Sequence, residues 1–254
     1  MNKTVRVLQI LIITIGLWGV LFPQSVTQDV FFREDFSNLD HWREYAFPKV
    51  DRLSEYSVTE MNGGLALKAV SKNSASALIL RKTFQVDSFP VLRWRWKVEN
   101  VYQKGDEKTK TGDDYPLRIY VNFKYEPDQA SILDKTKYAM AKAVAGEYPP
   151  RSALSYIWAN NSHTKRILPN AFQPEKTKMV ISREGTSHVG EWKTEQVHIL
   201  KDYRKAFGKS PPAIASLAIM NDSDGTGESS VAYIDFIELR ATTTDAKSPA
   251  TISD

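Results

Sequence analysis

The stretch PVLRWRWKV, residues 90–98, decides the fold class of this chain. Successive side chains of a β-strand point to opposite faces, so Trp94 and Trp96 face one way and Arg93 and Arg95 the other. Two tryptophans on one face predict a buried side, and two arginines predict a side open to water. This pattern is typical of a strand whose sheet covers a core with one face only.

Much of the remaining chain consists of similar short alternating segments, separated by Gly, Pro, Asn and Asp. We predict nine strands, at 63–70, 77–86, 90–98, 116–124, 153–159, 177–183, 192–200, 213–220 and 231–240. Nine strands with little helix predict an all-β protein, an antiparallel β-sandwich.

Two segments are predicted to be helical. The first, near 128–146, begins with an acidic residue, ends at Gly146 and spaces Ile132, Leu133 and Met140 as on an apolar helix face. We expect this helix to lie over one sheet or to cross one end of it. The second is short, near 200–208, and stops at Gly208 before two prolines.

Length and composition indicate a single globular domain. The chain has 254 residues, of which 42% are hydrophobic and 25% charged, and β-sandwich cores reach this size without division. The first residues, 1–27, have the layout of a cleaved signal peptide, with Lys3 and Arg6 before an apolar run and Pro23. An uncleaved membrane anchor is the alternative, although the run is short for a spanning helix. We therefore expect a sandwich domain at 28–240, a disordered polar tail at 241–254, and a periplasmic or secreted location.

Charge and cysteine content exclude several classes of function. Removal of Lys3 and Arg6 with the leader lowers the net charge from +4 to +2, which is not the strongly basic balance of a nucleic-acid-binding protein. We expect no nucleic-acid partner and no membrane insertion after cleavage. The chain has no cysteine, so disulfides, thiol chemistry and a cysteine-linked lipid anchor are all excluded.

A candidate ligand-binding face follows from the alternation in strand 116–124. Its outward residues are Arg118, Tyr120 and Asn122, which would join Arg93 and Arg95 in one patch if this strand paired with strand 90–98. Guanidinium groups bind carboxylates in bidentate fashion, and tyrosine offers an aromatic plane with a hydroxyl group.

The patch therefore predicts binding of a saccharide or another polar or anionic small ligand. Asp114, next to this strand, is a further candidate ligand-binding residue. The alternative is an ordinary solvated sheet face, in which Asp113 and Asp114 neutralise the arginines as internal salt bridges. The polar segment 100–114 before this strand is either a solvated loop or a flap over a site.

The segment DSDGT, residues 222–226, is a candidate metal loop. Asp222, Asp224 and Thr226 alternate with Ser and Gly, and oxygen ligands of this kind suit Ca²⁺, the candidate cofactor. The segment lacks the twelve-residue frame and the distal acidic residue of a calcium-binding hand. The same residues also form tight hairpins, so a turn held by side-chain hydrogen bonds is the alternative.

Familiar catalytic motifs are missing from the sequence. There is no G-x-S-x-G elbow, no phosphate-binding glycine loop and no H-E-x-x-H zinc helix, and the four histidines are scattered. Paired carboxylates leave no trace in spacing, so a glycoside hydrolase or polysaccharide lyase using Asp114 and Asp222, with Arg118 and Tyr120, stays open as an alternative function.

Several blocks of sequence, in this order, resemble one bacterial family: LRWRWKV (92–98), GDDYPLRIYVNF (112–123), LSYIWAN (154–160), DYRKAFG (202–208) and AIMNDSDGT (218–226). The family is domain of unknown function 3047, and the resemblance extends from about Phe32 to Leu239. It implies an exported bacterial protein with one jelly-roll-like sandwich similar to lectin and carbohydrate-binding domains. It implies no settled activity. A structural envelope protein without a ligand is therefore a third possibility.

The matching positions that recur in the family are Trp94, Trp96, Asp114, Arg118, Tyr120, Trp158, Tyr203, Phe207, Gly208, Asp222, Asp224 and Thr226. The polar members need partners if they are buried. If strands 116–124 and 213–220 share a sheet, we expect these polar residues to gather at one rim.

Overall fold

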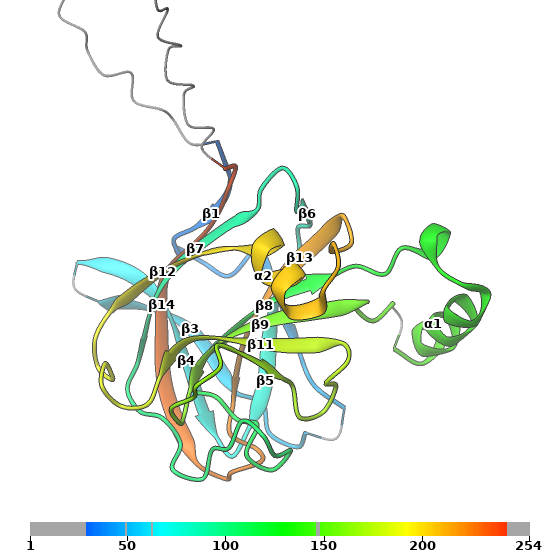
Figure 1. Cartoon of the computed structure of the whole chain (residues 1–254). Helices are drawn as coiled ribbons and strands as arrows, with labels where there is room; N and C mark the ends of the chain where they lie inside the picture. Colours follow the sequence, from blue (N-terminus) through cyan, green and yellow to red (C-terminus); the bar gives the residue numbers. More distant parts are fainter. Residues whose placement is uncertain (1–28, 49, 62, 146–147, 243–254) are drawn as a thin grey trace, which may run out of the picture.

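The computed structural model describes residues 29–48, 50–61, 63–145 and 148–242. The predicted signal peptide and nearly all of the predicted tail lie outside these described residues. Two β-sheets face each other and enclose the core (Figure 1). Among the described residues, no helix is long and apolar enough to cross a membrane.

The first sheet has six strands in the order β12-β7-β14-β4-β3, with β1 paired to β14. Its strands are β1 (Val30–Glu34), β3 (Glu55–Met61), β4 (Gly64–Lys72), β7 (Val91–Val98), β12 (Lys193–His198) and β14 (Ser229–Arg240).

The second sheet has eight strands in the order β10-β11-β9-β8-β13-β5-β2, with β6 paired to β13. Most neighbours are antiparallel, whereas β9 and β11 run parallel. Its strands are β2 (Trp42–Tyr45), β5 (Ala75–Leu80), β6 (Phe84–Gln85), β8 (Arg118–Phe123), β9 (Ser152–Ala159), β10 (Ile167–Pro169), β11 (Thr177–Glu184) and β13 (Ile214–Asp222). The predicted all-β, jelly-roll-like sandwich is confirmed.

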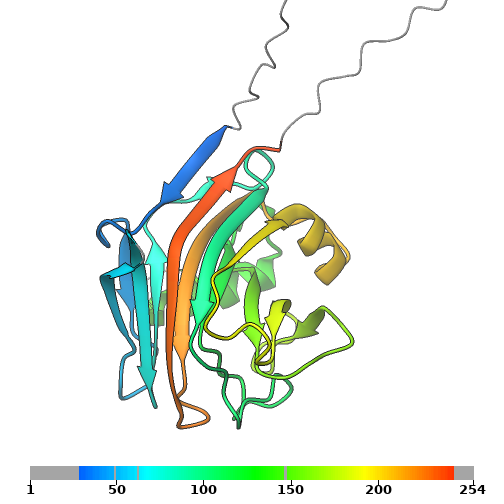
Figure 2. The same cartoon turned by 90° about the vertical axis from the view of Figure 1, so that its left-hand side faces the viewer.

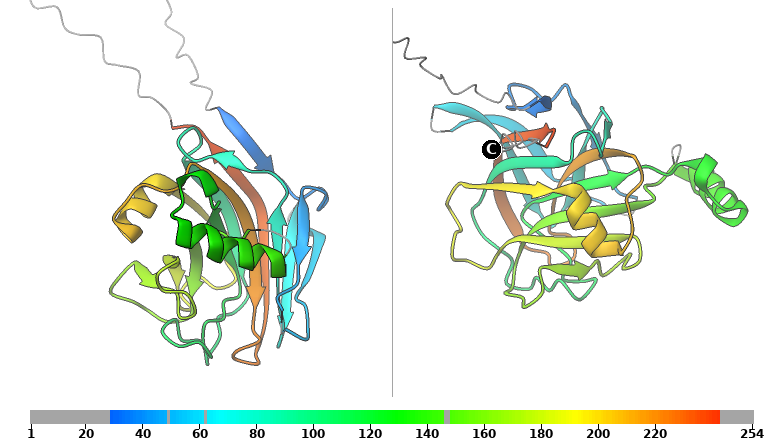
Figure 3. Two further views of the ribbon diagram at one scale, coloured as in Figure 1. Left: turned by 90° about the vertical axis from the view of Figure 1, so that its right-hand side faces the viewer. Right: turned by 45° about the horizontal axis from the view of Figure 1, so that its top comes forward.

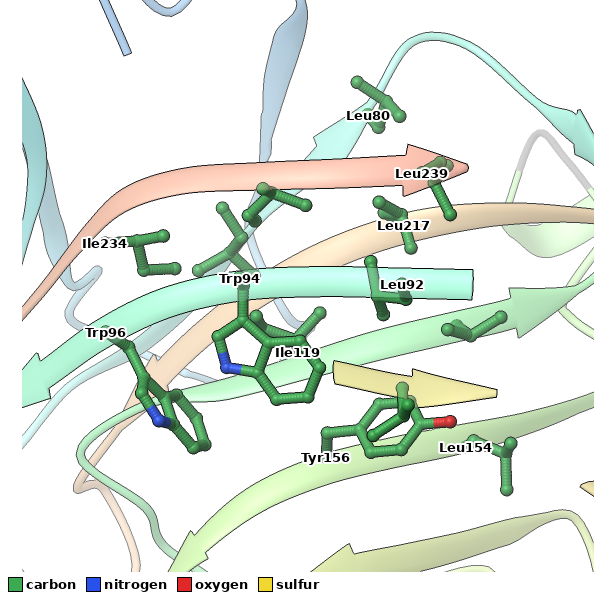
Figure 4. Packing of buried hydrophobic residues seen from close by; sticks show 14 of the residues in the cluster. Leu80, Leu92, Trp94, Trp96, Ile119, Leu154, Tyr156, Leu217, Ile234 and Leu239 are labelled. Carbon is green, nitrogen blue, oxygen red and sulfur yellow. The ribbon is translucent and has the colours of Figure 1, made fainter. Parts of the chain in front are cut away.

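Aromatic side chains join the two sheets across the core. Trp94 and Trp96 of β7 are completely buried, as their alternation predicts. Trp94 lies 5.4 Å from the ring of Tyr156, and Trp96 lies 5.6 Å from Trp158, both on β9 of the opposite sheet. Figure 4 shows Trp94 and Tyr156 within this cluster. Large rings on facing strands fill the space between the sheets and bury the most apolar area per residue.

The predicted pairing of strands 90–98 and 116–124 is wrong. β7 lies between β12 and β14, whereas β8 lies between β9 and β13 in the other sheet. The two strands bury their apolar faces against opposite sides of one core, and a pair within one sheet would not bring those faces together. Their outward residues therefore lie on opposite outer surfaces of the sandwich.

Three helical segments are present in the described part of the chain: η1 (Pro127–Gln129), α1 (Ile132–Ala145) and α2 (Ile199–Phe207). The prediction of α1 is confirmed, but the helix does not lie over a sheet. It projects from the ends of β8 and β9 (Figures 1 and 3). Its Tyr138 stacks on Tyr125 at 3.8 Å, while Ile132 and Leu133 are 83% and 84% exposed.

The short helix α2 follows β12 and ends as predicted. Gly208 adopts the left-handed conformation, with φ of 70°, and its N–H donates to the carbonyl of Arg204. Tyr203 turns inward, is buried and lies 4.5 Å from the ring of Phe123. Figure 2 shows α2 beside β12, at the side of the sandwich where β10 and β11 lie.

Candidate functional site

Arg93 and Arg95 lie on the outer face of the six-stranded sheet, each beside an acidic residue of β14. Arg93 forms an ion pair with Glu238 at 3.3 Å, and Arg95 pairs with Asp235 at 2.8 Å. A bulge between Ile234 and Phe236 allows Asp235 to stand out beside Arg95. The structure therefore does not bring these arginines together with Arg118.

Aromatic rings cover the same two arginines. The Arg95 guanidinium carbon lies 5.1 Å from the ring centre of Trp192, and that of Arg93 lies 5.8 Å from Phe236. Carboxylates and rings thus already engage both guanidinium groups. The alternative interpretation assigned Asp113 and Asp114 as the partners of these arginines, whereas the partners in the structure are Glu238 and Asp235.

Arg118, Tyr120 and Asn122 project from β8 onto the outer face of the eight-stranded sheet. Tyr120 and Asn122 are half-buried, whereas Arg118 is only 3% exposed. The residues across from Tyr120 are small, Ser155 on β9 and Ala218 on β13, and both are buried. The ring of Tyr120 is therefore flanked by short side chains and packs against the cluster of Ala75, Ala77 and Met220.

A buried ion-pair cluster surrounds Arg118. Its guanidinium donates to the carboxylate of Asp222, the last residue of β13, and lies 3.6 Å from a carboxylate oxygen of Asp113. Its Cζ atom is 4.8 Å from the ring centre of Tyr115 and 5.6 Å from that of Tyr120. β8 and β13 are neighbours, so the predicted gathering of polar residues at one rim is found.

Burial shifts the pKa values of acidic residues in this cluster. Burial raises the pKa of Asp222 well above its ordinary value against the attraction of Arg118, and the carboxylates of Asp114 and Asp113 raise it further. Burial also raises the pKa of Asp113, although Arg118 opposes this shift. One guanidinium therefore does not compensate all the carboxylates, and burial favours the protonated forms of Asp222 and Asp113.

Asp114 holds the loop that follows β13. Its carboxylate accepts hydrogen bonds from the backbone N–H of Thr226 at 2.6 Å and of Gly225 at 3.4 Å. Gly225 fits because a Cβ atom there would lie 2.8 Å from the carbonyl oxygen of Thr111. The loop after β13 is thus joined to the segment before β8 by the Asp114 carboxylate and by the close approach of Gly225 to Thr111.

The candidate metal residues are only partly brought together. Carboxylate oxygens of Asp114, Asp222 and Asp224 lie within 4.8 Å of one another. The Thr226 hydroxyl instead donates to the carbonyl of Ser223 and accepts from the N–H of Glu228. The side chain of Asp224 is exposed, and partial loss of water together with Asp114 raises its pKa.

The segment 100–114 is exposed at residues 108–111 but anchored by buried side chains on both sides of them. Glu107 is 1% exposed and accepts hydrogen bonds from the backbone N–H of Asn160 and from the ring of His163. Asn160 in turn donates to the carbonyl of Asp114. Sequence reasoning missed this anchoring, because an acidic residue inside a run of Lys, Thr and Gly gives no local sign of burial.

Comparison with solved structures found chains that are similar to this protein at low sequence identity. A lectin from Bauhinia forficata matches with 11% identity and a TM-score of 0.41, covering 86% of this chain and 100% of that chain. Trichoderma harzianum endoglucanase 3, of family GH12, matches with 9% identity and a TM-score of 0.38, covering 86% and 99%. Tailspike protein 4 of bacteriophage CBA120 has 7% identity and a TM-score of 0.37, over 81% of this chain. The match spans only 20% of the length of that tailspike chain.

A search among curated proteins found no similar sequence. A family model, however, matches residues 40–238, which is most of the chain and includes β7, β8, β13 and the Arg118 cluster. The chain belongs to the family described as protein of unknown function DUF3047.

Proposed function

We propose that this protein binds a saccharide on the outer face of the eight-stranded sheet, around Tyr120 and Asn122. The observation that carries this proposal is a partly exposed aromatic ring and a partly exposed amide, two residues apart on one strand, beside small buried neighbours. Such spacing places the two groups about 7 Å apart, comparable to a sugar ring. A ring offers its face to the apolar side of a sugar, and an amide bonds to hydroxyl groups.

A neutral saccharide suits this face better than an acidic one. Arg118, the cation nearest to Tyr120 on β8, is already bonded to Asp222 and Asp113. Asp114 and Asp224 add further negative charge at the same rim. A carboxylated ligand would therefore meet repulsion there, which replaces the expectation that arginines grip an anionic ligand.

The burial and the hydrogen bonds of Asp114 and Asp222 favour a structural role for these residues over a catalytic one. They are 3% and 1% exposed, and their oxygens accept hydrogen bonds from backbone N–H groups and from Arg118. A general acid or base must come within hydrogen-bond reach of the substrate. Buried and bonded in this way, the two carboxylates support the connection of loops at the rim of the binding face.

The proposal also includes a bound calcium ion and export of the protein. The three converging carboxylates support a Ca²⁺ ion held by Asp114, Asp222 and Asp224, with water as the remaining ligands. Export rests on the leader at residues 1–27, outside the described residues. It would place the binding face in the periplasm or outside the cell.

A panel of neutral oligosaccharides, followed by calorimetric titration of the best ligand, tests this proposal. We expect Tyr120→Ala to weaken binding by about tenfold, through loss of ring contact. Tyr233→Ala is the matched control, because Tyr233 is partly exposed on the outer face of the other sheet. The proposal fails if no neutral saccharide binds, or if the two substitutions have equal effects.

A further inference from the structure

A basic groove lies on the other side of the eight-stranded sheet from Tyr120. The groove has a volume of about 490 Å³ and is lined by the segment 164–169, which includes β10, by Lys178 of β11 and by Lys205 and Ala206 of α2. This volume falls within the range of small-molecule sites, about 300–1,000 Å³. Met179 lies opposite Ser155 on the outer face, so its neighbour Lys178 points to the inner side.

Four cationic side chains line the groove: Lys165, Arg166, Lys178 and Lys205. They come from three elements that are separated in sequence and brought together by the fold. No acidic residue is among the lining residues. Like charges gathered around one groove repel one another, so a counter-charge in the groove is favourable.

In the described part of the chain, ion pairs do not neutralise these cations. Within the ranges that the structure describes, none of the four forms an ion pair within 4.0 Å. Lys178 donates to the carbonyl of Pro174 and lies over the ring of Phe207 at 5.8 Å. This contrasts with Arg93, Arg95 and Arg118, which are all paired with carboxylates.

One acidic residue, Asp202 of α2, interacts electrostatically with cations that line the groove. Its carboxylate accepts a hydrogen bond from the hydroxyl of buried Tyr156, and it is attracted by Arg166 and Lys205. One half-buried carboxylate cannot balance four cations. The remaining lining is mainly apolar, with Ile167, Leu168 and Pro169 of β10 and Ala206 of α2.

We propose that this groove binds an oligosaccharide that carries carboxylate groups. The cations supply ion pairs, with Arg166 able to hold a carboxylate through two parallel hydrogen bonds. The apolar wall of β10 suits the apolar face of a sugar ring. The site is separate from the neutral-saccharide face around Tyr120, because the sheet itself lies between them.

The test uses trigalacturonate as the acidic probe and maltotriose as the neutral one, measured by calorimetric titration. We expect trigalacturonate to bind, and its affinity to fall as NaCl is raised from about 50 to about 200 mM. Lys205→Glu, on the groove wall, should weaken binding by at least about tenfold. Lys201→Glu is the matched control, since Lys201 is exposed one turn earlier on α2 and does not line the groove.

The outcomes separate this site from the first one. Tyr120→Ala should leave trigalacturonate binding unchanged, and circular dichroism should show both α2 variants folded. Equal effects of Lys205→Glu and Lys201→Glu would overturn the proposal. So would equal affinity for maltotriose, binding of inorganic phosphate alone, or loss of trigalacturonate binding in Tyr120→Ala only.

Discussion

Arg118 of β8 and Asp222 of β13 form a buried ion pair between residues 104 positions apart in the chain. Their side chains are only 4% and 2% exposed. Removal of one partner would leave the other charge buried and uncompensated. We therefore expect Arg118→Ala to lower the free energy of unfolding by about 3–5 kcal/mol, measured by urea denaturation.

Arg95→Ala provides the comparison for this pair. Arg95 also contacts an aspartate, Asp235, but its side chain is 42% exposed. Water screens such a pair, and we expect a loss below about 1 kcal/mol. Equal losses for the two substitutions would contradict the view that burial makes the Arg118 pair critical.

The raised pKa of Asp113 predicts that the stability of the folded protein depends on pH. Its pKa in the folded protein is raised by burial, so the folded state keeps a proton that the unfolded state has lost. The contribution of Asp113 to the free energy of unfolding is fully present below about pH 4, the ordinary pKa of an aspartate. This contribution is lost as the pH rises through the pKa of Asp113 in the folded protein.

Asp113→Asn imitates the protonated form at every pH. We expect the stability of this variant, relative to the natural protein, to increase as the pH rises from about 4 to about 7.5. Urea denaturation at several pH values gives the difference directly. A difference independent of pH would show that Asp113 titrates alike in both states.

The sequence allowed prediction of properties that depend on neighbours in the chain. Alternation gave the buried faces of β7 and β8 correctly, because the two-residue period is local. Alternation could not show which strands belong to the same sheet. Trp94 and Ile119 would be buried among apolar side chains in either case, whether β7 and β8 were neighbours in one sheet or faced each other from two sheets. The patch uniting Arg93 with Arg118 was wrong for that reason.

Short strands and isolated partners were also beyond prediction. β2 has four residues and β10 has three, too few to show a period. Asn170, which donates to Asp113, lies 57 residues away in a polar segment without any pattern. By contrast, the meeting of Asp114, Arg118 and Asp222 was predictable, because it needs only that β8 and β13 share a sheet.

Gly225→Ala tests the close approach of two loops at the rim. The new Cβ atom would lie 2.8 Å from the carbonyl oxygen of Thr111, a backbone atom that cannot turn away. We expect a loss of about 1–3 kcal/mol in urea denaturation, typical of steric overpacking. Gly64→Ala is the control, because nothing lies within 4 Å of its position, and its effect should stay near about 0.5 kcal/mol.

Calcium should stabilise the folded protein if the excess carboxylate charge at the rim is neutralised by a cation. A ligand that binds only the folded state adds about 2.7 kcal/mol at a concentration one hundred times its dissociation constant. We expect the melting temperature to rise with Ca²⁺ and to fall again with chelator. Asp224→Asn should abolish this rise, because it removes one of the three converging carboxylates.

The same variant distinguishes a cation from a proton as the neutralising charge. Asp224 is exposed, so Asp224→Asn should hardly change the melting temperature in the presence of chelator. Asp128→Asn, an exposed acidic residue outside the cluster, should respond to Ca²⁺ like the natural protein. If chelator leaves the melting temperature of the natural protein unchanged, protons on Asp222 and Asp113 are sufficient, and the loop after β13 acts only as a turn held by Asp114.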